Sequence, residues 1–515
     1  MPLSDLGIAL TPLTAPLPIF RGNVGPADWI AVAATVAAGG GRLVSLWGSD
    51  RRQESAAAFV VAASYALQEG LVWIELPLTG ADSTYPDLSD LFPAAARMQR
   101  ATADLLGIRA ADAEDRRPWL NHGAWPRVHF PLRREATGNE TFPDQSVTDY
   151  PFVRVEGDGV HEIAVGPVHA GIIEPGHFRF SVVGEKVLRL EERLGYTHKG
   201  TAKRFERLPA STAHRLAGRV SGDSTVAFAW AYCMALEAAR GMALPLRAAW
   251  LRALLLERER VANHLGDLGA LGNDAAFAFG LSQFMLLKED WLRLNRSLFG
   301  HRYLMDCIVP GGVATDIDAA GCDQLVAQCE AVERDVRLLR NIYEDHAGLQ
   351  DRFIGTGRVS PQLANQLGVT GMAGRASGMT ADLRADFAVA PYSELEFKVS
   401  SHRNGDVAAR VIVRFEEALE SLRLIRAIAR GLPEGPLVSD QFAHRAGVGA
   451  GWIEGWRGEV FVALEVEDER ILRCHCHDPS WHNWPALEHA VIGNIVPDFP
   501  LINKSFNLSY SGSDL

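Results

Sequence analysis

Hydrophobic residues in the first 135 positions follow two spacings that predict a small α/β unit. Trp29–Ala38 is apolar and rich in alanine, which is typical of a helix, and Asp90–Leu106 has apolar residues at intervals of three to four. The glycine run Gly39–Gly41 separates the first helix from Arg42–Trp47, which alternates like a strand, and Val72–Leu78 is a second strand candidate. We therefore expect helices and strands to alternate in this region.

A polar stretch then divides the chain. The segment Ala111–Glu135 holds two tryptophans, three prolines and a glycine, which is typical of a loop. Ala136–Tyr150 is polar and rich in turn-forming residues. The predicted organisation is a first domain over residues 1–135, a linker over 136–150 and a second domain over 151–515.

The second domain begins with strand patterns and continues into long helical patterns. Phe178–Val183 and Lys186–Leu190 flank Gly184-Glu185, which predicts a hairpin with a two-residue turn. Four long helices and a late strand pair follow: Ala210–Arg240, Leu246–Leu271, Phe279–Phe299 and Ala319–His346, then Val460–Glu467 and Arg470–His477. The predicted fold class is α+β, with a small α/β N-terminal domain followed by a large, mainly helical domain flanked by β-strands.

The amino-acid composition excludes several classes of protein. With 51 Lys and Arg against 63 Asp and Glu, the net charge of −12 argues against a nucleic-acid partner. Six cysteines in 515 residues are too few for a disulfide framework, which favours a reducing compartment. The longest apolar run, near Val226–Leu236, is about half of the ~20 residues that a bilayer helix needs. Because Met1–Leu10 also lacks Lys and Arg, we expect a cytoplasmic protein that could still dock on a membrane complex through other subunits.

One string has the residue types of a metal site. In Cys474-His475-Cys476-His477, a strand would turn both thiols to one face and both imidazoles to the other, so the four side chains could not converge on one tetrahedral ion. No two cysteines have the CxxC spacing, so we expect no iron–sulfur cluster bound by this chain alone. The prediction is that this chain binds no metal.

A helix face carries four polar side chains. Glu257, Arg260, His264 and Asp267 recur at intervals of three to four and so share one side of the helix. We favour an ion-paired stripe against a neighbouring element over a catalytic constellation.

The stretch Gly166–Phe180 places two histidines, a glutamate and an arginine between strand signals. A loop of this content, held by a sheet, is typical of a ligand-facing element. A tight hairpin with surface polar residues has the same composition, and the pattern alone leaves both interpretations open.

These residues continue into a long resemblance to a known family. With Gly184–Glu206, they resemble the large-subunit family that membrane-bound group 4 [NiFe] hydrogenases share with the 49-kDa subunit of respiratory complex I. Further stretches resemble that family: Arg375–Tyr392, Gly405–Ser421, Glu454–Glu459 and Gly493–Leu515. Arg97–Pro126 resembles the 30-kDa subunit of complex I. The presence of a 30-kDa-like and a 49-kDa-like region on one chain is similar to the fused large subunit of formate hydrogenlyase complexes.

This chain differs from the hydrogenase members of that family at the residues that carry out their chemistry. Ser221 and Ser224 stand where hydrogenases have the first pair of nickel-binding cysteines, and the second pair, after Asp-Pro, is replaced within Ser480–Asn483. Ala202 stands in place of the proton-relaying glutamate. Because a serine hydroxyl does not replace a thiolate at a soft nickel site, the resemblance predicts that hydrogen chemistry is absent.

The quinone site of complex I is matched only in part. His169 corresponds to the histidine beside the quinone headgroup, whereas Gly222 stands where the opposing tyrosine is expected. The resemblance therefore makes His169, Ser221, Gly222 and Ser224 candidates for a cavity that could bind quinone. The alternative interpretation of Ser221-Gly222-Asp223-Ser224 is a structural one, a helix N-cap.

The expected function is a core subunit of a membrane-associated, complex I-like oxidoreductase. By resemblance, it would form a redox cavity with a small subunit carrying a [4Fe–4S] cluster, near Lys199 and Arg219, and would lack a NiFe centre. The complex would include antiporter-like membrane subunits and lie on the inner face of the cell membrane. The alternative is a non-catalytic adaptor that couples an electron-transfer arm to the membrane ion-translocating subunits.

Overall fold

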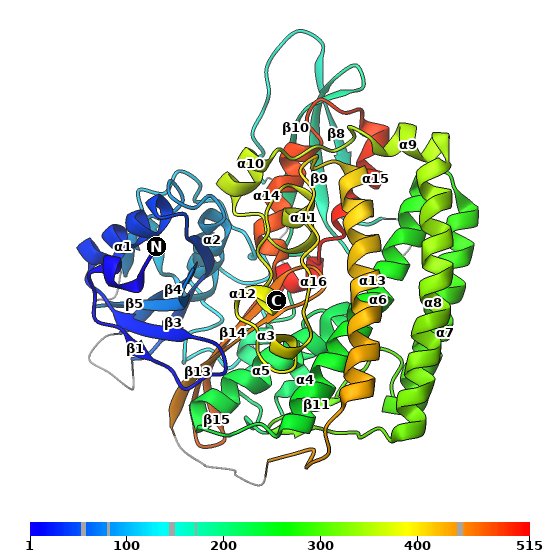
Figure 1. The fold of residues 1–515 in the computed structure, drawn as a ribbon. Helices are drawn as coiled ribbons and strands as arrows, with labels where there is room; N and C mark the ends of the chain where they lie inside the picture. Colours follow the sequence, from blue (N-terminus) through cyan, green and yellow to red (C-terminus); the bar gives the residue numbers. More distant parts are fainter. Residues whose placement is uncertain (53–57, 80–82, 144–149, 170–172, 440–445) are drawn as a thin grey trace.

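The structure, a computed structural model, describes residues 1–52, 58–79, 83–143, 150–169, 173–439 and 446–515. It is an α+β fold, as predicted. A five-stranded sheet with two covering helices forms most of the N-terminal region, and long helices with two three-stranded sheets and the short β11-β12 pair (Ile308–Val309 and Gly312–Val313) form the rest (Figure 1). No helix of the described residues is long and apolar enough to cross a membrane.

The N-terminal sheet has the order β1-β2-β5-β4-β3, with β2 and β5 parallel and the other pairs antiparallel. The predicted strands and the first helix are confirmed, and a buried strand between them was missed. The second helix was predicted from Asp90 but begins only at Ala95, because Pro93 disfavours helical backbone at the residue before it. The elements are η1 Leu3–Leu6, β1 Thr11–Pro12, β2 Ile19–Asn23, α1 Pro26–Ala38, β3 Arg42–Asp50, β4 Phe59–Leu67, β5 Gly70–Leu78, β6 Thr84–Pro86, α2 Ala95–Leu106 and β7 Arg109–Ala111.

The second region starts with an antiparallel sheet of order β10-β9-β8, formed by Val160–Val165 (β8), His177–Val183 (β9) and Lys186–Arg193 (β10). The predicted hairpin is confirmed. Gly184 sits in its turn with a φ of 59°, a conformation that glycine adopts without strain.

The helical body contains the four predicted long segments, with one correction. The segment predicted as one helix from Ala210 is divided at Gly218, where a Cβ would lie 2.8 Å from the Thr225 hydroxyl, so the chain makes a close turn that needs glycine. The elements are α3 Thr201–Phe205, α4 His214–Ala217, η2 Gly222–Ser224, α5 Thr225–Arg240, α6 Leu246–Asp274, α7 Ala278–Phe299, β11 Ile308–Val309, β12 Gly312–Val313, α8 Ala319–Asp345, α9 Ala347–Phe353, α10 Pro361–Leu367, α11 Gly371–Ala376, α12 Leu383–Asp386, η3 Tyr392–Glu394 and α13 Val407–Gly431.

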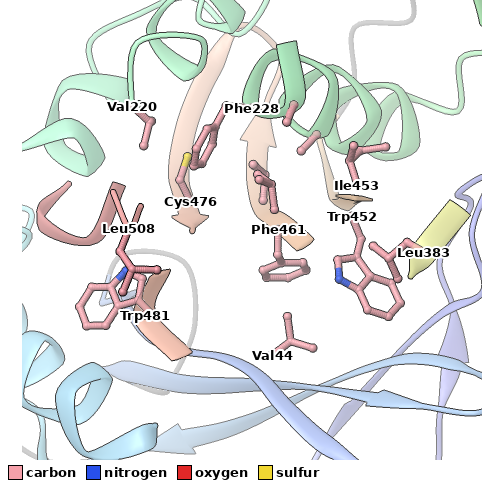
Figure 2. Close-up of a cluster of buried hydrophobic side chains, with 14 of the residues drawn as sticks. Val44, Val220, Phe228, Leu383, Trp452, Ile453, Phe461, Cys476, Trp481 and Leu508 are labelled. Atoms are coloured by element: carbon pink, nitrogen blue, oxygen red, sulfur yellow. The ribbon is translucent and has the colours of Figure 1, made fainter. Parts of the chain in front are cut away.

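The C-terminal sheet lies between α5 and the N-terminal sheet. Its antiparallel strands are β13 Gly447–Glu454, β14 Glu459–Glu467 and β15 Arg470–His477, and α14 Ser480–Ala490, η4 Val496–Asp498, α15 Phe499–Phe506 and α16 Tyr510–Asp514 follow. Figure 2 shows Phe228 of α5 on one side of this sheet and Val44 of β3 on the other.

Three glycines on one face of β13 bring α5 into close contact with the sheet. A Cβ on Gly451 or Gly449 would lie about 2 Å from the carbonyl oxygens of Ala231 and Ala235, namely 1.9 and 2.0 Å. No larger residue fits this approach, which sets the distance between the sheet and the middle and C-terminal turns of α5.

The strand with the Cys-His-Cys-His string alternates as predicted. Figure 2 shows Cys476 beside Phe228 and Val220 on the α5 side. His475 points the other way, where it stacks on Trp47 with ring centroids 4.8 Å apart. The thiols and imidazoles therefore contribute to two different packed interfaces.

The N-terminal region is joined to the C-terminal sheet by buried polar contacts. The Ser45 hydroxyl and His475 Nε2 are 2.7 Å apart, and Arg42 pairs with Glu459. Arg51 donates to Glu465 at 3.0 Å. The two regions therefore share an extensive interface in addition to the chain that connects them.

We propose that residues 1–135 and 151–515 are separate folding units joined by the linker over 136–150, of which 144–149 lie outside the described residues. Residues 137–141 are exposed, whereas Tyr150 is anchored by Arg100, which donates to its hydroxyl at 2.6 Å. Limited proteolysis should cut first within 136–150, because exposed backbone with little apolar packing opens at low cost. The two fragments should co-elute in native buffer and separate in denaturant. First cleavage within the helical body would contradict the two-unit organisation.

Candidate functional site

The turn at residues 221–224 lies where α4 and η2 meet the start of α5. Neither serine of the turn caps the helix with its side chain, although Ser224 holds the N-cap position. Glu259 of α6 takes that role, because its carboxylate accepts from the amides of Val226 at 2.7 Å and Ala227 at 3.3 Å. The capping interpretation of the two serines is therefore wrong.

The serine hydroxyls are engaged elsewhere. Ser221 and Ser224 are each only 3% exposed. The Ser221 hydroxyl donates to the Asp223 carboxylate at 2.7 Å and lies 2.9 Å from the hydroxyl of Ser509. The Ser224 hydroxyl accepts from Arg457 at 3.2 Å. Both candidate residues thus belong to one polar network.

Asp223 and Arg457 form the charged centre of that network. Arg457 donates to both carboxylate oxygens of Asp223 and to the carbonyl of Asn507, and its guanidinium lies 4.0 Å from the Trp456 ring centroid. Burial acts to raise the pKa of Asp223, but the Arg457 charge and hydrogen bonds outweigh it and hold the pKa at about 2. Asp223 is therefore an anion at every physiological pH.

The second segment that corresponds to hydrogenase ligands reaches the same network. The Ser480 hydroxyl accepts from the backbone amide of Ser509 at 2.9 Å. Asn483 accepts from the amide of Thr370 at 3.0 Å and donates to its carbonyl at 3.2 Å. Ser509 thus joins two segments that are more than 250 residues apart in sequence.

His169 reaches the network indirectly. Its Nε2 lies 2.7 Å from the carbonyl oxygen of Gly176, and its loop contacts the C-terminal helix, where Glu174 accepts from the amide of Ser511 at 3.2 Å. Residues 170–172 of this loop lie outside the described part of the chain. Ser221 therefore touches Ser509 directly, whereas His169 is linked to residues 509–511 only through its loop, and a shared cavity stays a prediction.

Lys199 and Arg219 lie directly beside the turn. The Lys199 ammonium donates to the carbonyls of Val220 at 2.8 Å and Arg219 at 3.3 Å, and burial lowers its pKa. Arg219 forms a bidentate pair with Asp306 at 2.7 and 2.8 Å. Two cations therefore stand at the outer side of Ser221.

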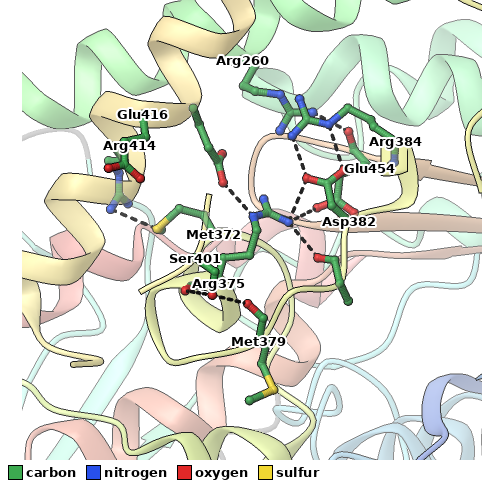
Figure 3. Close-up of polar contacts among 12 residues, drawn as sticks. Arg260, Met372, Arg375, Met379, Asp382, Arg384, Ser401, Arg414, Glu416 and Glu454 are labelled. Atoms are coloured by element: carbon green, nitrogen blue, oxygen red, sulfur yellow. Dashed lines mark hydrogen bonds and ion pairs between the residues drawn. The ribbon is translucent and has the colours of Figure 1, made fainter. Parts of the chain in front are cut away.

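The helix face at Glu257 is an ion-paired stripe, as predicted. Glu257 accepts from Arg384 at 3.1 Å, His264 pairs with Glu417 at 3.0 Å and Asp267 pairs with Arg414 at 3.0 Å. Figure 3 shows the stripe continuing to Arg375, which lies between Asp382 and Glu454. Each partner comes from another helix or from β13, so the stripe fastens α6 to its neighbours.

Comparisons with known proteins match both regions. Residues 23–142 match the family described as respiratory-chain NADH dehydrogenase, 30 kDa subunit, and residues 271–446 match the 49 kDa subunit. The chain is 30% identical to formate hydrogenlyase subunit 5 of Escherichia coli over 92% of its own length and 85% of that protein. It belongs to this family of fused 30-kDa and 49-kDa-type oxidoreductase subunits.

Further similar proteins are of the same kind. Hydrogenase-4 component G of Escherichia coli is 31% identical over 92% of this chain and 84% of its own length. A chain of the membrane-bound sulfane sulfur reductase, an archaeal respiratory membrane complex, superposes with a TM-score of 0.66 at 25% identity, covering 69% of this chain and 99% of that one. The relatives are thus subunits of respiratory or hydrogenase complexes.

The donor groups at the site do not fit the nickel centre of the hydrogenase members. Ser221, Ser224, Ser480 and Asn483 offer hydroxyl and amide groups, which are hard, weak ligands compared with thiolates. Each of them is also bound to protein groups through the contacts above. Among the described residues, no three His, Cys, Asp or Glu side chains are placed to hold a metal ion.

Sequence reasoning missed Glu259 and the role of Asp223. Glu259 lies two residues beyond Glu257 and points about 200° around the helix, away from the ion-paired stripe. The small cavity next to it is lined by Gly222, Asp223 and Asn263 among others. The spacing of polar residues along α6 does not predict a contact with the start of α5.

Replacing Asp223 with Asn should destabilise the chain, because Arg457 would keep its charge in a buried position without an anionic partner. We expect a loss of about 1–3 kcal/mol, which thermal unfolding of the assembled complex would detect as a lower midpoint. Arg219→Gln is the matched control, since its exposed pair with Asp306 contributes at most about 1 kcal/mol. Equal midpoints for Asp223→Asn and wild type would show that Arg457 does not depend on Asp223.

Proposed function

We propose that this chain is the core subunit of a membrane-associated, complex I-like oxidoreductase that forms a redox cavity with a small subunit carrying a [4Fe–4S] cluster and that lacks a NiFe centre. Membership of the family supports the oxidoreductase assignment. The name of the sulfane sulfur reductase complex supports attachment to a membrane. In this proposal the chain lies peripherally on the inner face of the cell membrane, held by antiporter-like subunits.

The observation that supports the proposal is which groups at the centre of the site are charged and which are neutral. By the family resemblance, neutral hydroxyls stand at Ser221 and Ser224 where hydrogenases have thiolates, while Asp223 between them supplies an anion to Arg457. The site therefore keeps an anion–cation pair, of which the arginine is buried, and polar groups, but no soft ligand. Such a site can bind a polar substrate and cannot replace a nickel–thiolate centre.

Lys199 and Arg219 support the placement of the partner's cluster. A cation near a cluster stabilises the reduced, more negative state, and hydrogen bonds and charges around a cluster set its potential. Both cations lie beside Ser221, where electrons from the cluster would enter the cavity. In this proposal the chain shapes and polarises the cavity, and the small subunit holds the metal.

The absence of nickel is directly testable. Elemental analysis of the complex purified from its native source should find iron, from the small subunit, and no nickel above background, because a site without thiolates does not retain it. The iron content serves as the control for an intact preparation. Stoichiometric nickel bound to this chain would refute the proposal.

His169 provides the test of the cavity. His169→Ala should lower turnover of the intact complex about 100-fold if the imidazole moves a proton, since general acid–base catalysis contributes about 10²–10⁴-fold. Ser221→Ala should cost less than about tenfold, because one neutral hydrogen bond contributes about 0.5–1.5 kcal/mol. His161→Ala, an exposed histidine on β8, is the matched control. Unchanged turnover in His169→Ala with full assembly would contradict the cavity.

The second candidate function is a structural adaptor. It is favoured by the burial of Ser221 and Ser224 and by the engagement of both hydroxyls with other protein groups. An adaptor would couple the electron-transfer arm to the membrane subunits without touching substrate. In that case both His169→Ala and Ser221→Ala would leave electron transfer unchanged, whereas Asp223→Asn would weaken assembly.

A further inference from the structure

Glu259 is a buried carboxyl group that lacks a close cationic partner among the described residues. It is 5% exposed and is held by the two amides at the start of α5, Val226 and Ala227. Glu257 on the same helix is buried to the same degree but is bound by Arg384 and Arg260. The two glutamates therefore sit in opposite electrostatic environments only two residues apart.

A small cavity joins Glu259 to the turn and to the surface. It is lined by Gly222, Asp223, Glu259 and Asn263 and, from the loop after α7, by Arg302 and Tyr303. Tyr303 is 43% exposed, and the side chain of Asp223 is 37% exposed. A proton entering beside Tyr303 would therefore meet Glu259 and Asp223 in the same cavity.

The charged groups around Glu259 are each bound to other partners. Asp223, from the turn, is an anion bound to Arg457, and Arg302, from the loop after α7, is neutralised by Glu289. Arg260 of α6 donates to Glu257 and to backbone carbonyls of β13 and the loop after it.

The pKa values of the two carboxyl groups of the cavity differ widely. Burial and the nearby charge of Asp223 raise the pKa of Glu259 to about 8, against the amides of α5 and the charge of Arg260, which lower it. The pKa of Asp223 is about 2. One carboxyl group is therefore fixed as an anion while the other exchanges a proton near neutral pH, which is the division of roles seen between paired acids in enzymes.

We propose that Glu259 is the proton carrier of this site, taking protons from the cavity beneath Tyr303 and delivering them to the acceptor bound at the Ser221–Ser224 turn. In each cycle the Glu259 carboxylate takes a proton from a water molecule of the cavity, and a proton from solvent converts the hydroxide left behind back to water. The carboxylic acid then releases that proton towards the bound acceptor and returns to the carboxylate. This inference rests on the proposed redox function, and it supplies a proton route where Ala202 replaces the relay glutamate of hydrogenases.

The test is infrared difference spectroscopy of the intact complex across pH, combined with turnover. Glu259→Gln keeps the shape and one acceptor for the α5 amides but cannot carry a proton. The wild-type complex should show a carboxylic acid C=O band with a midpoint near pH 8, and Glu259→Gln should lack it. Glu454→Gln is the matched control: it removes another buried glutamate, whose pKa is about 7, and should leave the component near pH 8 in place.

Turnover decides whether the titrating group lies on the proton route. We expect Glu259→Gln to lower turnover about 100-fold with assembly and thermal midpoint near wild type, since general acid–base groups contribute about 10²–10⁴-fold. Loss of the band with unchanged turnover would overturn the proton-carrier role and leave the redox function standing. Retention of the band in Glu259→Gln would also overturn it. A complex with no electron transfer in wild type would refute the proposed function, and this inference with it.

Discussion

The ion pair between Asp223 and Arg457 is the interaction on which the centre of this molecule depends. It joins the turn before α5, the loop between β13 and β14 and, through the carbonyl of Asn507, the C-terminal segment. Leaving this guanidinium without its anion would cost about 1–3 kcal/mol. Because the flanking Ser221 and Ser224 offer only neutral hydroxyls, Asp223 is the anion of the turn that neutralises this arginine.

The C-terminal segment converts this local pair into a wider structure. Ser509 contacts both Ser221 and Ser480, and Asp514 accepts from the backbone of Gly195 and from Thr197. The last seven residues thus hold together the turn at 221–224, the start of α14 and the loop that carries Lys199. Displacing this segment would loosen every element that faces the proposed cavity at once.

The ion-paired stripe on α6 gives the site a rigid support. Buried pairs contribute little net stability, because desolvation offsets their attraction, but breaking one leaves an uncompensated charge. Each pair therefore penalises displacement of α6 relative to α13 or β13. On the opposite side of the same helix, Glu259 is bound by the amides of Val226 and Ala227 and has no such ionic partner among the described residues. In our proposal this side of the helix exchanges a proton, while the other side is a fixed support.

The sequence by itself determined the family and the longest helices. Local periodicity located α6, α7, α8 and both hairpins, because the spacing of apolar residues reflects contacts within a few positions. It also identified Ser221 and Ser224 as departures, since those positions are defined by neighbouring motif residues. Only the tertiary structure decided that the predicted helix from Ala210 breaks at Gly218, that Glu259 caps α5, and that Ser480 and Ser221 meet at Ser509. Each of these depends on which residues approach across tens or hundreds of positions, and the pattern along one chain segment does not record that approach.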